Sequence, residues 1–136
     1  MTHPTASCRK ILVVEDLRIV AKDLQSRLKR MGHAVVGAVT TGEEAVREAE
    51  REQPEIVLMD IVLAGPMDGV GAARIIREHF GIPVIYLTAH ADDETVRRAH
   101  ATGPAHYLLK PFEDRELQDA IDLAVSTRAA DMSFDS

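Results

Sequence analysis

Polar side chains that could hold a cation and a phosphoryl group stand directly after four short apolar runs of this sequence. They are Glu15-Asp16, Asp60, Thr88 and Lys110. Carboxylates gathered in one crevice repel one another unless something positive lies between them. Oxygen ligands at this density suit a hard cation with octahedral preference, which predicts Mg2+ or Mn2+.

The same side chains are equipped for the attack of a carboxylate on phosphorus. Asp60 is the predicted nucleophile, because aspartate forms covalent acyl phosphates. No general base is required, since a carboxylate is already ionised at neutral pH. The cation and Lys110 would neutralise charge on the phosphoryl oxygens, and the Thr88 hydroxyl would bind one of them.

Taken singly, each of these residues also has an ordinary structural explanation. An acidic pair after a strand is often a solvated turn or a helix N-cap, and Asp60 could be another cap. Thr88 could be a strand-end hydroxyl, and Lys110 with the following proline a loop before a helix. The functional interpretation therefore requires that one sheet gather all four positions.

Five β-branched, apolar runs alternate with amphipathic stretches along the chain. Strands are expected at 11–14, 34–39, 55–59, 82–87 and 105–109. Three of these runs are almost continuously apolar, which is typical of strands buried on both faces. There is no repeat, low-complexity tract or internal linker.

The stretches between the strands carry the spacing and the caps of helices. Each is predicted by an apolar repeat at helical intervals or by a capping residue. In chain order these signals are the apolar repeat from Leu17 to Met31, the Thr41–Glu44 capping box, a stretch over about 69–79, the N-cap Asp92 and the apolar face from Leu117 to Val125.

Strands separated by helices of about ten residues pair in parallel through right-handed crossovers. We therefore predict an α/β fold, a doubly wound (βα)5 domain with a five-stranded parallel sheet in the flavodoxin-like order 2-1-3-4-5. Such a sheet binds its ligand at the carboxyl ends of the strands, beside the first strand. The four polar positions fall at that edge.

Composition sets the expected surroundings of this domain. The length of 136 residues fits one domain, which we expect over 9–126 between flexible segments at 1–8 and 127–136. The net charge of -6 argues against non-specific nucleic-acid binding. The single cysteine, Cys8, fits a reducing compartment. Apolar runs stay far below the roughly 20 residues of a membrane span, so we expect a cytoplasmic protein.

Five short motifs resemble the sequence blocks of bacterial response-regulator receiver domains. They are VVED at 13–16, LMD at 58–60, MDG at 67–69, LTA at 87–89 and LKPF at 109–112. The resemblance spans roughly 9–126, in the family's order and at close to its spacing. It implies a signalling switch rather than an enzyme with an external substrate. It also implies that Asp60 takes its phosphoryl group from a sensor histidine kinase or a histidine phosphotransfer protein.

The resemblance also implies roles for individual residues. Asp16 and Asp60 are expected to bind Mg2+ directly with the backbone carbonyl of Val62, and Glu15 is expected to act mainly through water. The peptide bond between Lys110 and Pro111 is expected to be cis, as in similar domains.

A switch in the fourth helix, fifth strand and fifth helix is implied as well. Thr88 would move towards the phosphoryl group, and Tyr107, whose alternative role is that of a half-buried tyrosine, would fill the vacated space. The residues of this face include Arg97, Arg98, His100, His106 and Tyr107. The output would be contact with an unidentified downstream protein, by a monomer or a phosphorylation-dependent homodimer.

The sequence departs from the family pattern in three places. Glu15 stands where Asp is commoner, and the loop from Ile61 to Gly69 is about one residue longer than usual. Val62 is apolar where side chains flank incoming water, which predicts slow self-dephosphorylation. His90 could instead position water, or it could be a lone histidine facing solvent.

Other functions are weighed against the receiver interpretation. An aspartate-nucleophile phosphatase needs a second Asp two residues after the nucleophile, where this chain has Val62. A flavodoxin-like or dinucleotide-binding module needs glycines or hydroxyls after the first strand, where Glu15 and Asp16 would repel phosphate. An interaction module with an inert phosphorylation site stays open. The initial methionine and the polar tail favour a stand-alone single-domain regulator; a phosphorelay intermediate or a module of a larger regulator or hybrid kinase is the alternative.

Overall fold

The computed structural model describes residues 8–63, 65–89, 97–98, 101 and 106–134. Five parallel strands form one sheet in the order β2-β1-β3-β4-β5, which confirms the predicted α/β fold. The strands are β1 (Lys10–Val14), β2 (Ala34–Val39), β3 (Ile56–Asp60), β4 (Val84–Thr88) and β5 (His106–Leu109). The helices are α1 (Arg18–Arg30), α2 (Gly42–Glu52), α3 (Gly69–Phe80) and α5 (Asp114–Phe134).

The helix expected to begin at Asp92 lies largely outside the described residues, as do Asp92, His90 and His100. Between β4 and β5 the structure describes helical backbone at 97–98 and 101. None of the helices within the described ranges is long and apolar enough to cross a lipid bilayer.

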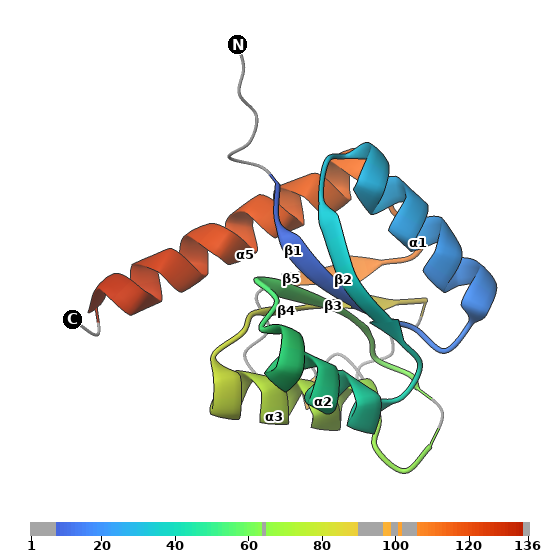
Figure 1. Ribbon diagram of the computed structural model, residues 1–136, viewed down its shortest axis with the longest axis horizontal. Helices are drawn as coiled ribbons and strands as arrows, with labels where there is room; N and C mark the ends of the chain where they lie inside the picture. Colours follow the sequence, from blue (N-terminus) through green and yellow to red (C-terminus); the bar gives the residue numbers. More distant parts are fainter. Residues whose placement is uncertain (1–7, 64, 90–96, 99–100, 102–105, 135–136) are drawn as a thin grey trace.

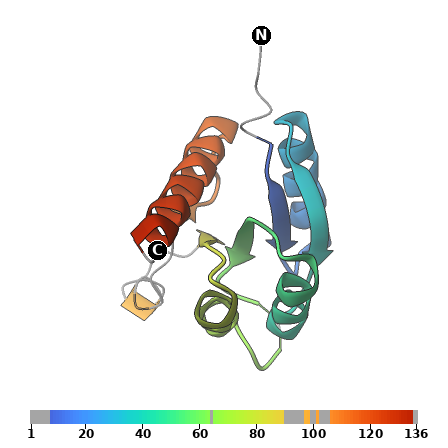
Figure 2. The same cartoon turned by 60° about the vertical axis from the view of Figure 1, so that its left-hand side comes forward.

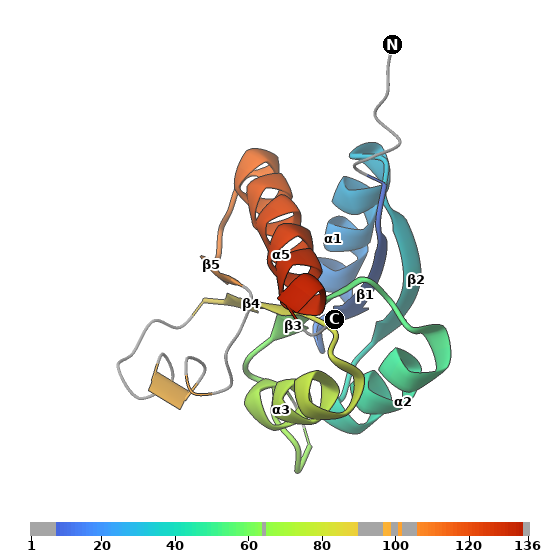
Figure 3. The same cartoon turned by 90° about the vertical axis from the view of Figure 1, so that its left-hand side faces the viewer.

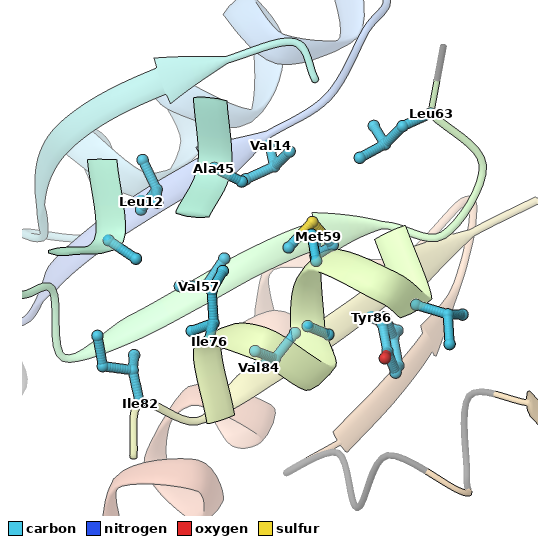
Figure 4. Packing of buried hydrophobic residues seen from close by; sticks show 14 of the residues in the cluster. Leu12, Val14, Ala45, Val57, Met59, Leu63, Ile76, Ile82, Val84 and Tyr86 are labelled. Carbon is cyan, nitrogen blue, oxygen red and sulfur yellow. The ribbon is translucent and has the colours of Figure 1, made fainter. Parts of the chain in front are cut away.

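Two layers of helices enclose the sheet, with α1 and α5 on one face and α2 and α3 on the other (Figure 1). Side chains alternate between these faces along each strand. In β3, for example, Val57 and Met59 pack towards α2 and α3, in the core shown in Figure 4. Ile56 and Leu58 pack towards α1 and α5. Every residue of β3 is buried, as its continuous apolar run predicts.

Side-chain caps mark the first residues of α2 and α3. The Thr41 hydroxyl accepts a hydrogen bond from the Glu44 N–H at 3.2 Å, as the capping-box pattern predicts. The Glu44 carboxylate accepts a hydrogen bond from the Thr40 N–H at 3.3 Å. In a regular capping box the donor would be the N-cap residue itself, Thr41. Asp68 caps α3, since its carboxylate accepts from the Gly71 N–H at 2.9 Å.

Several element boundaries differ from the sequence-based prediction. β3 and β4 include Asp60 and Thr88 as their last residues, because the inter-strand ladder continues to them. Leu17 does not join the buried stripe of α1; it is the N-cap residue and is 58% exposed. The helical backbone of α5 continues to Phe134, past the domain limit predicted at 126, and no Gly or Pro interrupts its sequence. The domain limits at 9 and 126 stay a prediction.

The loop between Asp60 and α3 is anchored at several points. Ile61 and Leu63 are buried beneath it, while Val62 points to solvent. The Gly69 N–H donates to the Ile61 carbonyl at 2.9 Å, which closes the loop. A Cβ at Gly69 would overlap the Asp60 carbonyl oxygen and lie 2.8 Å from Ile61 Cα. The close return of the chain on Asp60 therefore requires glycine at 69.

Replacing Gly69 by alanine tests this close approach. Because the added methyl group meets backbone atoms, Gly69→Ala should lower the free energy of unfolding by about 1–3 kcal/mol in urea denaturation. Gly71→Ala is the matched control, since its Cβ would lie 3.4 Å from the nearest atom, in ordinary contact. That control should be neutral or stabilising by up to about 1 kcal/mol. Equal effects of the two substitutions would contradict the packing argument.

Candidate functional site

A lysine and two carboxylates meet at the carboxyl ends of β1, β3 and β5. Lys110 Nζ lies 2.7 Å from Glu15 Oε1 and 3.1 Å from Asp60 Oδ2. Strand alternation explains the meeting, because Val13, Leu58 and Leu108 all pack on the α1/α5 face. Each of the three charged residues comes two positions after one of them, and so falls on that same face.

Asp16 joins this pair to make a compact group of three carboxylates. Oxygens of Glu15, Asp16 and Asp60 lie within 4.8 Å of one another. Glu15 is 1% and Asp60 8% exposed, so water screens their repulsion poorly. Lys110 supplies positive charge to two of the three, Glu15 and Asp60. A hard divalent cation with oxygen ligands fits this donor set.

Hydrogen bonds hold the two buried carboxylates in position. The second oxygen of Glu15 accepts from the Leu17 N–H at 3.1 Å. Asp60 Oδ1 accepts from the Val62 N–H at 3.0 Å, while Oδ2 faces Lys110. Val62 thus touches the site through its backbone, and its side chain is 51% exposed. The predicted role of the Val62 carbonyl as a metal ligand stays a prediction.

Lys110 carries its positive charge at neutral pH. Burial by itself lowers its pKa, but the hydrogen bond to Glu15 and the charge of Asp60 outweigh burial and raise the pKa. The peptide bond to Pro111 is cis, as predicted. The Lys110 N–H donates to the Thr88 carbonyl at 2.8 Å, which ties the start of this loop to the end of β4.

Thr88 and Tyr107 share the opposite face of the sheet. Tyr86 belongs to the core beneath α2 and α3, Tyr107 packs against that core, and Thr88 follows Tyr86 by two positions. Thr88 is fully buried and Tyr107 is half-buried. The register pairs Tyr86 with Tyr107. This shared face is compatible with the predicted relation between Thr88 and Tyr107, which stays a prediction.

Arg27 of α1 was not predicted to support the site. Its Nε donates to Asp114 at 2.6 Å, its Nη2 donates to the Phe112 carbonyl at 2.7 Å, and its guanidinium lies 4.8 Å from the Phe112 ring centre. These contacts fasten the loop that carries Lys110 to α1. Nothing in the local sequence indicates them, because the partners are 85 and 87 positions away.

Neutralising Lys110 tests its part in balancing the carboxylates. Lys110→Gln leaves Glu15 and Asp60 as buried like charges, so the free energy of unfolding measured with a chelator present should fall by about 1–3 kcal/mol. Lys29→Gln on the exposed side of α1 is the control, and we expect a change within about 0.5 kcal/mol. If both variants unfold at the same urea concentration, Lys110 does not hold this cluster together.

A protein family and several known proteins match most of this chain. The model of the response regulator receiver domain matches residues 11–122. The transcriptional regulatory protein PdtaR of Mycobacterium tuberculosis is 37% identical over 131 residues, covering 93% of this chain and 63% of PdtaR. The DNA-binding response regulator MtrA of Mycobacterium leprae is 37% identical over 111 residues, covering 80% of this chain and 48% of MtrA. The chain thus spans about half of the length of MtrA and just under two thirds of the length of PdtaR.

Solved structures share both the fold and the sequence pattern. The signal receiver domain of a modulated diguanylate cyclase from Desulfovibrio desulfuricans G20 superposes with a TM-score of 0.87 at 36% identity, covering 91% of this chain and 98% of that one. The receiver domain of the sensor histidine kinase PA1611 from Pseudomonas aeruginosa PAO1, with a magnesium ion coordinated in its active site cleft, gives 0.79 at 34% identity, covering 88% and 98%. This chain belongs to the response regulator receiver domains, the signalling switches of two-component systems.

Proposed function

We propose that Asp60 accepts a phosphoryl group from the phosphohistidine of a sensor histidine kinase or a histidine phosphotransfer protein. The observation that carries this proposal is the Lys110 ammonium bridging Glu15 and Asp60, with Asp16 in the same group. An Asp60 oxygen forms the new bond to phosphorus, and the histidine nitrogen leaves with the electron pair of the broken N–P bond. Asp60 is ionised when it attacks, so it needs no general base.

The surrounding side chains supply charge and orientation for this transfer. Lys110 neutralises charge on the phosphoryl oxygens, and the Thr88 hydroxyl donates to one of them. Asp16, Asp60 and the Val62 carbonyl would hold Mg2+ or Mn2+ directly, with Glu15 acting through water. That cation would add positive charge beside the transferred group. The magnesium ion of the PA1611 receiver domain supports this choice of cofactor.

The proposed output is contact with a downstream protein. Thr88 and Tyr107 would change together after phosphorylation and alter the surface of β5, α5 and the segment that contains Arg98. The protein would act in the cytoplasm, as a monomer or as a homodimer formed on phosphorylation. A place within a phosphorelay, or as one module of a larger regulator, is the alternative use of the same chemistry. The longer chains of PdtaR and MtrA are compatible with it.

Incubation with acetyl phosphate and Mg2+ tests the acceptor directly. Intact-mass measurement should show the gain of one phosphoryl group, because Asp60 is the ionised nucleophile beside Lys110. The gain should disappear in Asp60→Asn and with a chelator present. Absence of a mass gain, where a known receiver domain reacts in parallel, would indicate an interaction module with an inert site. A gain that persists in Asp60→Asn would place the acceptor elsewhere.

Val62 should set the lifetime of the acyl phosphate. Its apolar side chain is 51% exposed next to Asp60 and offers no hydrogen bond to an attacking water. Val62→Asn should therefore shorten the lifetime several-fold in a time course of phosphate loss. Leu123→Asn on α5 is the control, since Leu123 is similarly exposed at 49% and should leave the lifetime unchanged. A wild-type lifetime of seconds would overturn the slow-hydrolysis proposal.

A further inference from the structure

An ion pair joins the start of α3 to the described helical residues between β4 and β5. Asp68 Oδ1 accepts the Gly71 N–H at 2.9 Å, and Asp68 Oδ2 lies 2.7 Å from Arg98 Nη2. One carboxylate therefore both caps α3 and holds Arg98. Burial raises the pKa of Asp68, but the Gly71 N–H and the Arg98 guanidinium outweigh it and keep the pKa below its usual range. Both partners are charged at neutral pH.

Asp68 is closely connected to the acceptor Asp60. The next residue, Gly69, packs against the Asp60 carbonyl, and its N–H donates to the Ile61 carbonyl at 2.9 Å. Leu63 is buried within the same loop at 7% exposure. Asp68 therefore cannot shift far without disturbing the backbone of Asp60. In the same way, a backbone shift at Asp60 would be transmitted to Asp68 through Gly69.

Described residues of α3 and of the helical backbone between β4 and β5 line a common cavity. A cavity of about 260 Å³ lies between them, lined by Val70, Gly71, Arg74, Arg98 and Ala101. In Figures 2 and 3 the described helical residues, drawn in orange, lie on the side of α3 opposite to α2. Arg98 and Ala101 therefore do not pack closely against Gly71 and Arg74 at this point. The Asp68–Arg98 pair spans the same gap.

We propose that Asp68 and Arg98 form a tether that positions Arg98 at the start of α3 and couples it to the chemical state of Asp60. This inference rests on the proposed phosphorylation of Asp60. The tether is proposed to stabilise the arrangement in which Lys110 contacts the Asp60 carboxylate itself, at 3.1 Å. A contact that stabilises one of two states opposes the ligand that favours the other. Breaking the tether therefore strengthens the response to a phosphoryl group on Asp60.

A double-mutant cycle tests this coupling. Asp68→Asn keeps a side chain that can cap α3 but removes the charge, and Arg98→Gln removes the guanidinium. The apparent affinity for beryllofluoride with Mg2+, a mimic of the aspartyl phosphate, is followed by the chemical shifts of Thr88 and Lys110. Each single variant should bind about 1.5- to 5-fold more tightly, the range that a partly exposed ion pair supports. The double variant should match the single ones, since the pair is already broken.

The control is Arg51→Gln, which removes another exposed arginine from an ion pair, 2.6 Å from Glu48 on α2. It should leave the beryllofluoride affinity unchanged. Hydrogen exchange should also rise in peptides that contain Arg98 in both single variants, and not in the control.

Three outcomes decide against the tether. Unchanged affinity in the single variants, with normal binding by the wild type, overturns it and leaves the proposed function intact. Fully additive effects in the double variant show that Asp68 and Arg98 act separately. A wild type that binds no beryllofluoride while a known receiver domain does overturns the proposed function and the tether together.

Discussion

The Lys110 ammonium between Glu15 and Asp60 is the interaction on which the arrangement of this protein depends. The two carboxylates are almost completely withdrawn from water, and without a cation between them their repulsion would oppose folding. Lys110 and Glu15 are 95 positions apart in the chain. The parallel sheet, in which β1, β3 and β5 end at one edge, brings these charges together. An edge of the sheet that holds two buried carboxylates is also suited to bind a divalent cation.

Much of the remaining structure keeps the partners of this contact in place. The loop after Asp60 is closed by Gly69 and anchored by Ile61 and Leu63. On the other side, Arg27 holds the loop after Lys110 through the Phe112 carbonyl and ring. Both devices act on the backbone next to Asp60 or Lys110.

The sheet order and the members of the carboxylate group could be predicted because they follow from local patterns. Continuous apolar runs such as that of β3 indicate buried parallel strands, and the ends of such strands share one edge. The first and last residues of the helices were less predictable from the sequence. Leu17 fits the apolar spacing of α1, yet it precedes the helix and is exposed. The helical backbone of α5 passes 126 because a helix satisfies its own hydrogen bonds, with or without a neighbouring core.

By itself the sequence determined the type of domain, the strand order, and the presence of Glu15, Asp16, Asp60, Thr88 and Lys110 at strand ends. These features depend on the periodicity of apolar residues, which can be read over a few neighbouring positions. Only the tertiary structure decided that Arg27 clamps the Lys110 loop, that Gly69 packs on the Asp60 carbonyl, and that Asp68 both caps α3 and binds Arg98. Such contacts join residues that are distant in the chain, and the folded path of the backbone selects their partners among many side chains of the same type.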